Sequence, residues 1–297
     1  MVRKFHQRVL AWCANKGFFN FLSDKQYLEL VYYARVGHIL HLDNPRMFTE
    51  KIQWLKLYDR KPEYSLMVDK YEAKKYVAKK IGKEYIIPTL GVWDKFDDID
   101  FDFLPEQFVL KCTHDSGGLV ICRDKKFLDV NLAKKKIEKS LRRNYYKHSR
   151  EWPYRNVKPR IIAETYMTNG LDCDLVDYKM HCFNGNPMYC QVIQGRTTHQ
   201  TIDFYDMEWN RMDFTGLHSP DHPYPHGEYL SEPSKFILMK NLARCLSKEL
   251  KYSRIDFYLV NDNVFFGEIT FYPVGGFGCF EPQEWDVQLG NMIQIPE

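Results

Sequence analysis

Apolar residues recur at helical spacing through the first part of the chain. We predict helices over residues 23–34, 49–58 and 69–82, because Ser, Thr or Asp, which favour helix starts, begins each segment. The first 22 residues are basic and amphipathic and predict a further helix at the N-terminus. Helices therefore precede the first strand.

From residue 85 onward the pattern changes to short runs rich in β-branched and aromatic residues. These runs predict strands over residues 86–93, 107–114, 118–124, 160–167, 177–183, 188–195, 254–260 and 264–271. Two amphipathic segments, residues 134–144 and 232–250, predict helices. Tight turns such as Asn184-Gly185 join the strands of the second half, so the sheets should be mainly antiparallel and the fold class α+β.

The order of these elements divides the chain into three predicted regions. Residues 1–84 form a helical region, residues 85–158 a small lobe with a glycine-containing hairpin, and residues 159–297 a large lobe. The chain has 297 residues, of which 44% are hydrophobic and 27% charged. This composition is sufficient to bury a core and excludes a disordered protein.

The charge of the chain is nearly balanced, with 42 Lys and Arg against 39 Asp and Glu and a net charge of +3, which argues against a nucleic-acid partner. No apolar run approaches the roughly 20 residues of a membrane helix. The basic N-terminus leaves a weak membrane-surface association as the minority interpretation. Eight cysteines without a C-x-x-C pair predict reduced thiols in a cytoplasmic protein. The sequence leaves a homodimer open.

The segment LKCTHDSGGLVIC places a lysine and two glycines at a turn between predicted strands. Backbone N–H groups of Gly117 and Gly118 could approach phosphate oxygens closely, and Lys111 would supply the compensating charge. The spacing matches neither the Walker nor the Rossmann glycine motif. A Gly-Gly pair is more often a plain hairpin turn, so both interpretations stay open.

Two carboxylates lie on opposite strands of the last predicted hairpin. Asp256 and Glu268 stand among large apolar residues, where an unpaired carboxylate is costly, so a positive group should lie between them. Magnesium would suit, because it takes oxygen ligands from one or two carboxylates together with substrate phosphates. Thr270 lies on the same strand face as Glu268. The alternative is a pair of ordinary salt bridges with Arg254.

The order of these features along the chain resembles that of the ATP-grasp ligases, with two lysines, a glycine flap, a hinge glutamate and a late acidic metal strand. More narrowly, five phrases resemble the TupA-like ATP-grasp family, which is associated with bacterial surface polysaccharides such as teichuronopeptide. These phrases are FTEKIQWLKLYDR, VDKYEAKKYVAKKIG, FVLKCTHDSGG, VKPRIIAETYM and FFGEITFYP. The resemblance implies the ATP-grasp fold, with ATP bound between two α+β lobes.

The resemblance also implies roles for individual residues. The nucleotide would be bound by Lys70, Lys111, Ser116, Gly117, Gly118, Glu164, Thr165, Tyr166, Met167, Asp177 and Lys179. Mg²⁺ would be held by Asp256, Glu268 and Thr270, although the superfamily usually has Asn where this chain has Thr270. Arg254 would stabilise the oxyanion of the reaction, and Lys179 would face the γ-phosphate. We expect Lys111 and the two carboxylates to close around one triphosphate in a single cleft.

The activity implied is an ATP-dependent carboxylate–amine ligation through an acyl phosphate. The acceptor would be a uronic acid or a peptide branch of a surface polysaccharide, and the donor an amino acid or amine. A glycosyltransferase is the alternative, since Asp172-Cys173-Asp174 has the spelling of a metal-binding D-x-D motif. A non-catalytic nucleotide-binding scaffold ranks last, because both acidic residues of the hairpin are present.

Overall fold

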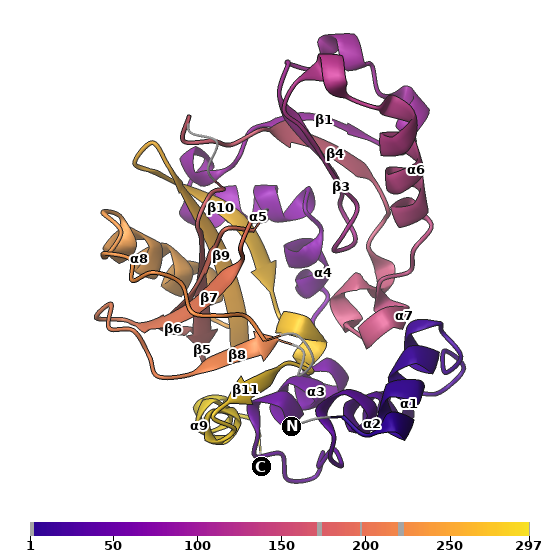
Figure 1. Ribbon diagram of the computed structural model, residues 1–297, viewed down its shortest axis with the longest axis vertical. Coiled ribbons are helices and arrows are strands. Elements are labelled where there is room, and N and C mark those ends of the chain that lie inside the picture. Colours follow the sequence, from indigo (N-terminus) through magenta and orange to yellow (C-terminus); the bar gives the residue numbers. More distant parts are fainter. Residues whose placement is uncertain (1–2, 171–173, 197, 219–222, 297) are drawn as a thin grey trace.

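The computed structural model describes residues 3–170, 174–196, 198–218 and 223–296 and shows two lobes above a helical base (Figure 1). In the small lobe, the antiparallel strands β1 (Thr89–Trp93), β4 (Ile161–Thr165), β2 (Phe108–Cys112) and β3 (Leu119–Cys122) lie in that order. Helix α6 (Val130–Leu141) packs on β2 and β3. Its apolar side chains Ala133 and Ile137 share one buried cluster with Phe108 and Leu110.

The large lobe contains a five-stranded antiparallel sheet. Its strands lie in the order β10 (Asn263–Thr270), β9 (Tyr252–Val260), β5 (Asp177–Phe183), β6 (Asn186–Gln194) and β7 (Thr201–Asp206). Helix α8 (Phe236–Ser247) packs on β5, β6 and β9, and α5 (Glu72–Ile81) packs on α8. Side chains alternate along a strand, so Met180 of β5 and Ile255 of β9 point to the face opposite that of their neighbours Lys179 and Asp256.

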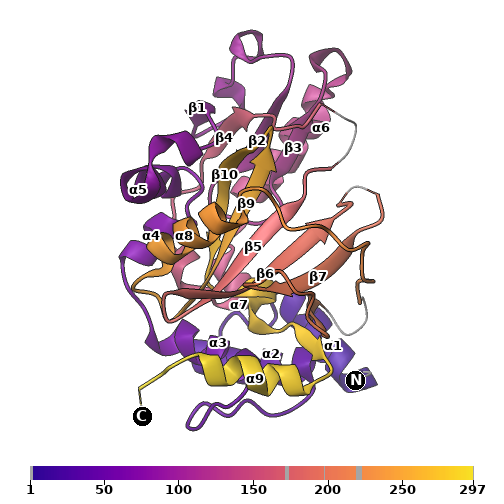
Figure 2. The same ribbon diagram turned by 90° about the vertical axis from the view of Figure 1, so that its left-hand side faces the viewer.

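The base consists of helices from both ends of the chain. Figure 2 shows α9 (Glu284–Met292) lying along α3 (Phe48–Tyr58), a contact that joins the C-terminal and N-terminal regions. A two-stranded sheet of β8 (Thr215–His218) and β11 (Cys279–Glu281) lies beside them. The remaining helices are α1 (Phe5–Asn15), α2 (Asp24–Val36), α4 (Glu63–Val68) and α7 (Tyr146–Ser149), with short 3₁₀ turns at Lys83–Tyr85, Phe96–Asp98, Phe101–Phe103, Lys125–Phe127, Trp152–Asn156 and Pro273–Gly276.

The predicted α+β class and the antiparallel pairing of its strands are confirmed. Several predicted helix starts are wrong. Helix α3 begins at Phe48, and Thr49 instead donates its hydroxyl hydrogen to Asp286 at 2.8 Å. Helix α5 begins at Glu72 and not at Asp69, and α8 begins at Phe236 and not at residue 232. The predicted helix 134–144 begins earlier, at Val130, because the side chain of Asp129 accepts a hydrogen bond from the backbone of Leu132. Strands β7, β8 and β11 and helix α9 were not predicted.

Two contacts cross the predicted region boundaries. Strand β4, which follows the boundary after residue 158, pairs with β1 and β2 in the sheet of the small lobe. Within residues 1–84, Phe48 and Ile52 of α3 are buried in the core of the large lobe, whereas residues 14–42 contribute to a separate apolar cluster. Among the residues described, no helix is long and apolar enough to cross a membrane.

Candidate active site

Two cavities lie where the lobes meet. The first, which we call the hinge cavity, has a volume of about 230 Å³ and lies beside residues 164–167 at the end of β4. Its apolar walls include Ile87, Val109, Leu119, Ile121 and Tyr258. The second, which we call the arginine cavity, has a volume of about 320 Å³ and contains both Arg35 and Arg254 in its lining.

Glu164 is held by two lysines at the edge of the hinge cavity. Lys111 of β2 lies 2.5 Å from one carboxylate oxygen and Lys74 of α5 lies 2.6 Å from the other. Lys74 also donates to the carbonyl oxygen of Ile87 at 2.6 Å. Burial alone would raise the pKa of Glu164, but the two ammonium groups outweigh it and lower that pKa to about 2. The carboxylate is therefore ionised at neutral pH.

The low pKa of Glu164 predicts a stability change in acid. A lowered pKa stabilises the fold above the unfolded pKa near 4.5, and the contribution is lost as the pH falls toward 2. Across this window we expect wild type to lose about 3 kcal/mol of unfolding free energy that Glu164→Gln does not lose. Chemical denaturation at several pH values measures the difference. Equal losses in both proteins would contradict the assignment.

A row of charged side chains crosses the polar face of the large sheet from the hinge cavity toward the arginine cavity. Asp177 lines the hinge cavity and lies 3.5 Å from Lys179, which in turn pairs with Asp256 of β9. Strand register explains this contact, because Lys179 and Asp256 stand opposite each other on β5 and β9. We call Asp177, Lys179, Asp256, Arg254 and Glu268 the charged row.

Within the charged row, Arg254 joins Asp256 to Glu268. Its guanidinium donates to both oxygens of Asp256, at 2.7 and 2.8 Å, and to Glu268 at 2.9 Å. A third contact reaches the hydroxyl of Thr270 at 3.1 Å. Burial alone would lower the pKa of Arg254, but Asp256 and Glu268 raise it, so the guanidinium stays charged. The salt bridges considered from the sequence are thus present.

An irregularity in β10 brings Glu268 beside Asp256. The pairing with β9 shifts between Phe266 and Ile269, which leaves Gly267 and Glu268 unpaired in the ladder. A Cβ atom at Gly267 would lie 3.2 Å from the carbonyl oxygen of Asp256, so glycine permits this close approach. The Glu268 side chain is 44% exposed and lines the arginine cavity. It is the accessible carboxylate of the charged row.

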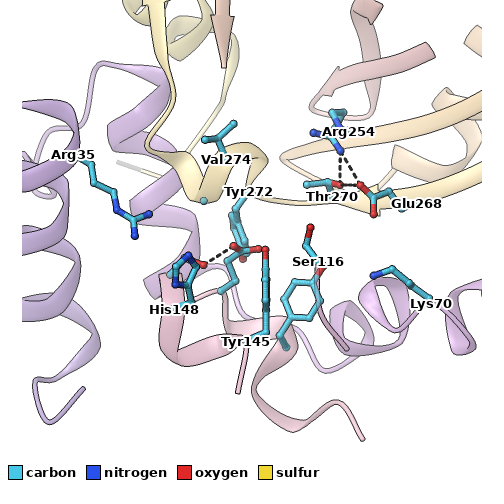
Figure 3. Close-up of a pocket in the computed structure, with 14 residues that line it drawn as sticks. Arg35, Lys70, Ser116, Tyr145, His148, Arg254, Glu268, Thr270, Tyr272 and Val274 are labelled. Atoms are coloured by element: carbon cyan, nitrogen blue, oxygen red, sulfur yellow. Dashed lines mark hydrogen bonds and ion pairs between the residues drawn. The ribbon is translucent and has the colours of Figure 1, made fainter. Parts of the chain in front are cut away.

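The glycine turn contributes to the arginine cavity through Ser116. Figure 3 shows Ser116 and Lys70 pointing into this cavity on the side where Glu268 and Thr270 lie. Asp115 stabilises the turn: its buried carboxylate accepts hydrogen bonds from Ser140 and from the backbone N–H of Gly118. Lys70 donates to the carbonyl oxygen of Asp115 at 2.5 Å.

The two glycines of the turn have separate structural roles. Gly117 has φ of +138°, a conformation that side chains rarely adopt, and nothing lies within 4 Å of the position its Cβ would take. A Cβ at Gly118 would instead collide with the Cys112 side chain at 2.7 Å. Neither glycine belongs to the lining of the hinge cavity or of the arginine cavity. Their predicted contact with phosphate therefore remains a prediction.

The acidic hairpin fits Mg²⁺ only if the ion is shared with a ligand. Both oxygens of Asp256 already accept hydrogen bonds from Lys179 and Arg254, which leaves Glu268 as the open carboxylate. Within the described residues, no three acidic, His or Cys side chains come together to hold a metal. Mg²⁺ commonly takes one or two carboxylates plus phosphate oxygens and water, and this donor set meets that requirement.

The structure places most predicted site residues in the linings of these two cavities. Lys111, Glu164, Thr165, Tyr166, Met167 and Asp177 line the hinge cavity, whereas Lys70, Ser116, Arg254, Glu268 and Thr270 line the arginine cavity. Lys111 and Glu268 thus line different cavities, which the charged row links, and their closure around one triphosphate stays a prediction. Of the D-x-D sequence, Asp172 and Cys173 lie outside the described residues, and Asp174 lines the hinge cavity.

The sequence missed several site residues. Lys74 of α5 pairs with Glu164 together with Lys111. Lys70, which was predicted for the nucleotide site, precedes α5 and lines the arginine cavity. Arg196 lies 2.5 Å from Asp177 and lines the hinge cavity. No local signal distinguished Lys74 from the other lysines of residues 70–80, because Lys70 itself lies before the helix. No local signal marked Arg196.

The far wall of the arginine cavity is aromatic and basic. Tyr145, Tyr154 and Tyr272 line it, together with His148 and Arg35. Arg35 comes from α2 and lies at the opposite side of the view from Glu268 and Lys70 (Figure 3). Burial, together with nearby Arg35, lowers the pKa of His148 to about 4, so this imidazole is neutral at pH 7.

Comparisons with known proteins give both structural neighbours and a family. D-alanine–D-alanine ligase from Bacillus anthracis complexed with ATP is 16% identical, with a TM-score of 0.41 over 70% of this chain and 54% of that one. The enzyme from Helicobacter pylori is 13% identical, with a TM-score of 0.39 over 83% of this chain and 69% of that one. The chain thus spans about half the length of the first neighbour. No curated protein matches it in sequence.

The family model is the more specific result. It is described as TupA-like ATP-grasp and matches residues 50–294, a range that includes every residue of the charged row and most of both cavity linings. The match confirms the resemblance and the ATP-grasp fold expected from it. The chain therefore belongs to the TupA-like ATP-grasp family, within the ATP-grasp ligase superfamily.

Proposed function

We propose that this protein is an ATP-dependent carboxylate–amine ligase that acts through an acyl phosphate. The observation that carries the proposal is the charged row, which joins an apolar cavity to a basic one. An adenine ring requires an apolar slot with backbone polar groups at its edge, and a triphosphate requires cations. The hinge cavity supplies the apolar environment, and the charged row and the arginine cavity supply the cations.

The nucleotide would lie along the charged row. Its adenine would enter the hinge cavity between Ile121 and Tyr258, beside the backbone of residues 164–167. The ribose would lie near Asp177, and the phosphates would continue past Lys111 and Lys179 toward the arginine cavity. Ser116 and Lys70 would meet the terminal phosphate there, under the glycine turn. The turn would exclude water from the reactive intermediate.

The chemistry requires two bond exchanges. An acceptor carboxylate oxygen attacks the γ-phosphorus and breaks its bond to the β–γ bridging oxygen, which gives an acyl phosphate and ADP. An amine then attacks the acyl carbon, loses a proton and expels phosphate. Arg254 would stabilise the negative charge that develops on the acyl oxygen. A bound Mg²⁺, held by Glu268 and phosphate oxygens and assisted by Asp256 and Thr270, would neutralise charge on the transferred phosphoryl group.

The acceptor would occupy the far wall of the arginine cavity. The guanidinium of Arg35 is held by Asn15 at 2.7 Å and lies 5.0 Å from the Phe277 ring, without a carboxylate among its described partners. A guanidinium without a carboxylate partner would bind an anionic ligand favourably. The tyrosines beside it could stack on a sugar ring. A uronic acid or an acidic peptide branch of a bacterial surface polysaccharide meets both requirements.

Ligand-dependent thermal unfolding tests the proposal against the alternative. ATP with Mg²⁺ at a hundred times its dissociation constant stabilises a protein by about 2.7 kcal/mol, so we expect a rise of roughly 5 °C or more in melting temperature. Nucleotide sugars should produce no rise. The converse result would favour a glycosyltransferase. ADP release should then depend on both a uronic acid and an amine, and release that ignores both would contradict the ligase.

A further inference from the structure

Five large apolar side chains are exposed within residues 5–21. Phe5, Val9 and Trp12 follow one another at helical spacing along α1, on the face opposite the buried Ala11 and Ala14. Beyond the helix, Phe18 is exposed with its ring centre 6.0 Å from that of Trp12, and Phe21 is exposed three residues later. Phe5 and Phe21 are each 82% exposed and Trp12 is 55% exposed. We call these five residues the apolar ridge. Exposed apolar side chains gathered in one region mark a surface that contacts a partner or a membrane.

The charged residues of the segment that carries the ridge are all basic. Lys4, Arg8 and Lys16 are exposed in the same segment, and the sequence contains no Asp or Glu before Asp24. The ammonium of Lys16 lies 5.8 Å from the ring centre of Trp12, so charge and ridge are adjacent. Exposed aromatic side chains flanked by basic ones characterise helices that lie in the interface of an anionic lipid bilayer.

We propose that the apolar ridge docks this protein onto an anionic membrane surface. The aromatic rings would enter the headgroup region, and the basic side chains would bind lipid phosphates. The ridge is already held on a folded scaffold, because the buried face of α1 packs on α2, so docking would order little additional chain. Charge favours lipid over a second copy of the chain, whose ridge would carry the same positive charge.

The ridge is connected to the arginine cavity. Asn15, the last residue of α1, accepts a hydrogen bond from Arg35 of α2, which lines that cavity. A docked ridge would therefore place the acceptor end of the cavity near the lipid surface. The position of the acceptor end near lipid rests on the proposed function, whereas docking itself does not. Such a position would suit an acceptor that is carried on a lipid.

Vesicle sedimentation tests the proposal directly. Full-length protein should bind vesicles of phosphatidylcholine mixed with about one third phosphatidylglycerol, and bind pure phosphatidylcholine far more weakly. The triple variant Phe5→Ser, Trp12→Ser, Phe21→Ser should lose at least about a hundredfold in affinity, since each ring removed costs roughly tenfold. Lys4→Ala with Lys16→Ala should cost roughly tenfold or more, and added salt should have a similar effect.

A matched control uses two exposed phenylalanines of the small lobe. Phe103 and Phe127 are 89% and 87% exposed, so Phe103→Ser with Phe127→Ser removes two similarly exposed rings away from the ridge and should leave vesicle binding unchanged. Equal loss in this control would overturn the proposal. So would an absence of vesicle binding in wild type, or ridge-dependent dimers in light scattering without vesicle binding. Nucleotide-induced stabilisation should persist in the triple variant, which separates docking from the ligase proposal.

Discussion

Replacement of Glu268 by Gln should reduce magnesium-dependent ADP release by roughly 10²- to 10³-fold. Gln keeps the shape of the side chain and an oxygen that can accept from Arg254 and Thr270, so the local fold should persist. It removes the negative charge of the exposed carboxylate that the charged row presents to the arginine cavity. Loss of charge stabilisation at the transferred phosphoryl group accounts for an effect of this size.

Steady-state ADP release during a magnesium titration measures the effect of Glu268→Gln. Higher Mg²⁺ should restore part of the rate, because the substitution weakens the ion's binding. Glu138→Gln is the matched control: Glu138 is 36% exposed, lies 3.9 Å from Lys134, and belongs to α6, away from both cavities. Activity of Glu268→Gln within about threefold of this control would show that the hairpin does not bind the reacting group.

The sequence predicted local structure well because hairpins and capped helices are specified by neighbouring residues. The acidic hairpin of β9 and β10 is one example, since the alternation of polar and apolar residues fixes which side chains share a face. Sheet membership was predicted less well. Strand β4 pairs with β1 and β2, which are distant in sequence, and no local pattern determines that choice.

The same distinction applies to the candidate site. The family motifs single out Glu164 and Glu268, which line the two cavities, and Asp256, which lies in the charged row, but the ion pairs that neutralise these carboxylates are tertiary. Lys74 reaches Glu164 only because α5 packs beneath the hinge, and Arg35 reaches the arginine cavity only because α2 folds against it. Arg35 also lies outside the residues that the family model matches. Residues that reach the site only by tertiary packing can be identified from a structure but not from the local sequence.

Replacement of Lys111 by Met should weaken ATP binding by roughly a hundredfold. The substitution keeps the length of the side chain and removes the ammonium, which lies 2.5 Å from Glu164 at the hinge cavity. A hydrogen bond to a charged partner contributes about 1.5–3 kcal/mol, and the lost bond to nucleotide phosphate accounts for the effect. Titration with a fluorescent ATP analogue measures it. Lys158→Met, at an exposed lysine paired with Asp94 at 2.8 Å, is the control.

A double variant separates phosphate binding by Lys111 from its pairing with Glu164. Lys111→Met alone leaves the buried Glu164 carboxylate with one cation, so it could weaken ATP binding merely by disturbing the hinge. Lys111→Met combined with Glu164→Gln removes that imbalance. If Lys111 binds phosphate, the double variant should regain stability in denaturant and still bind ATP about a hundredfold more weakly than wild type. Recovery of affinity together with stability would show that Lys111 only neutralises Glu164.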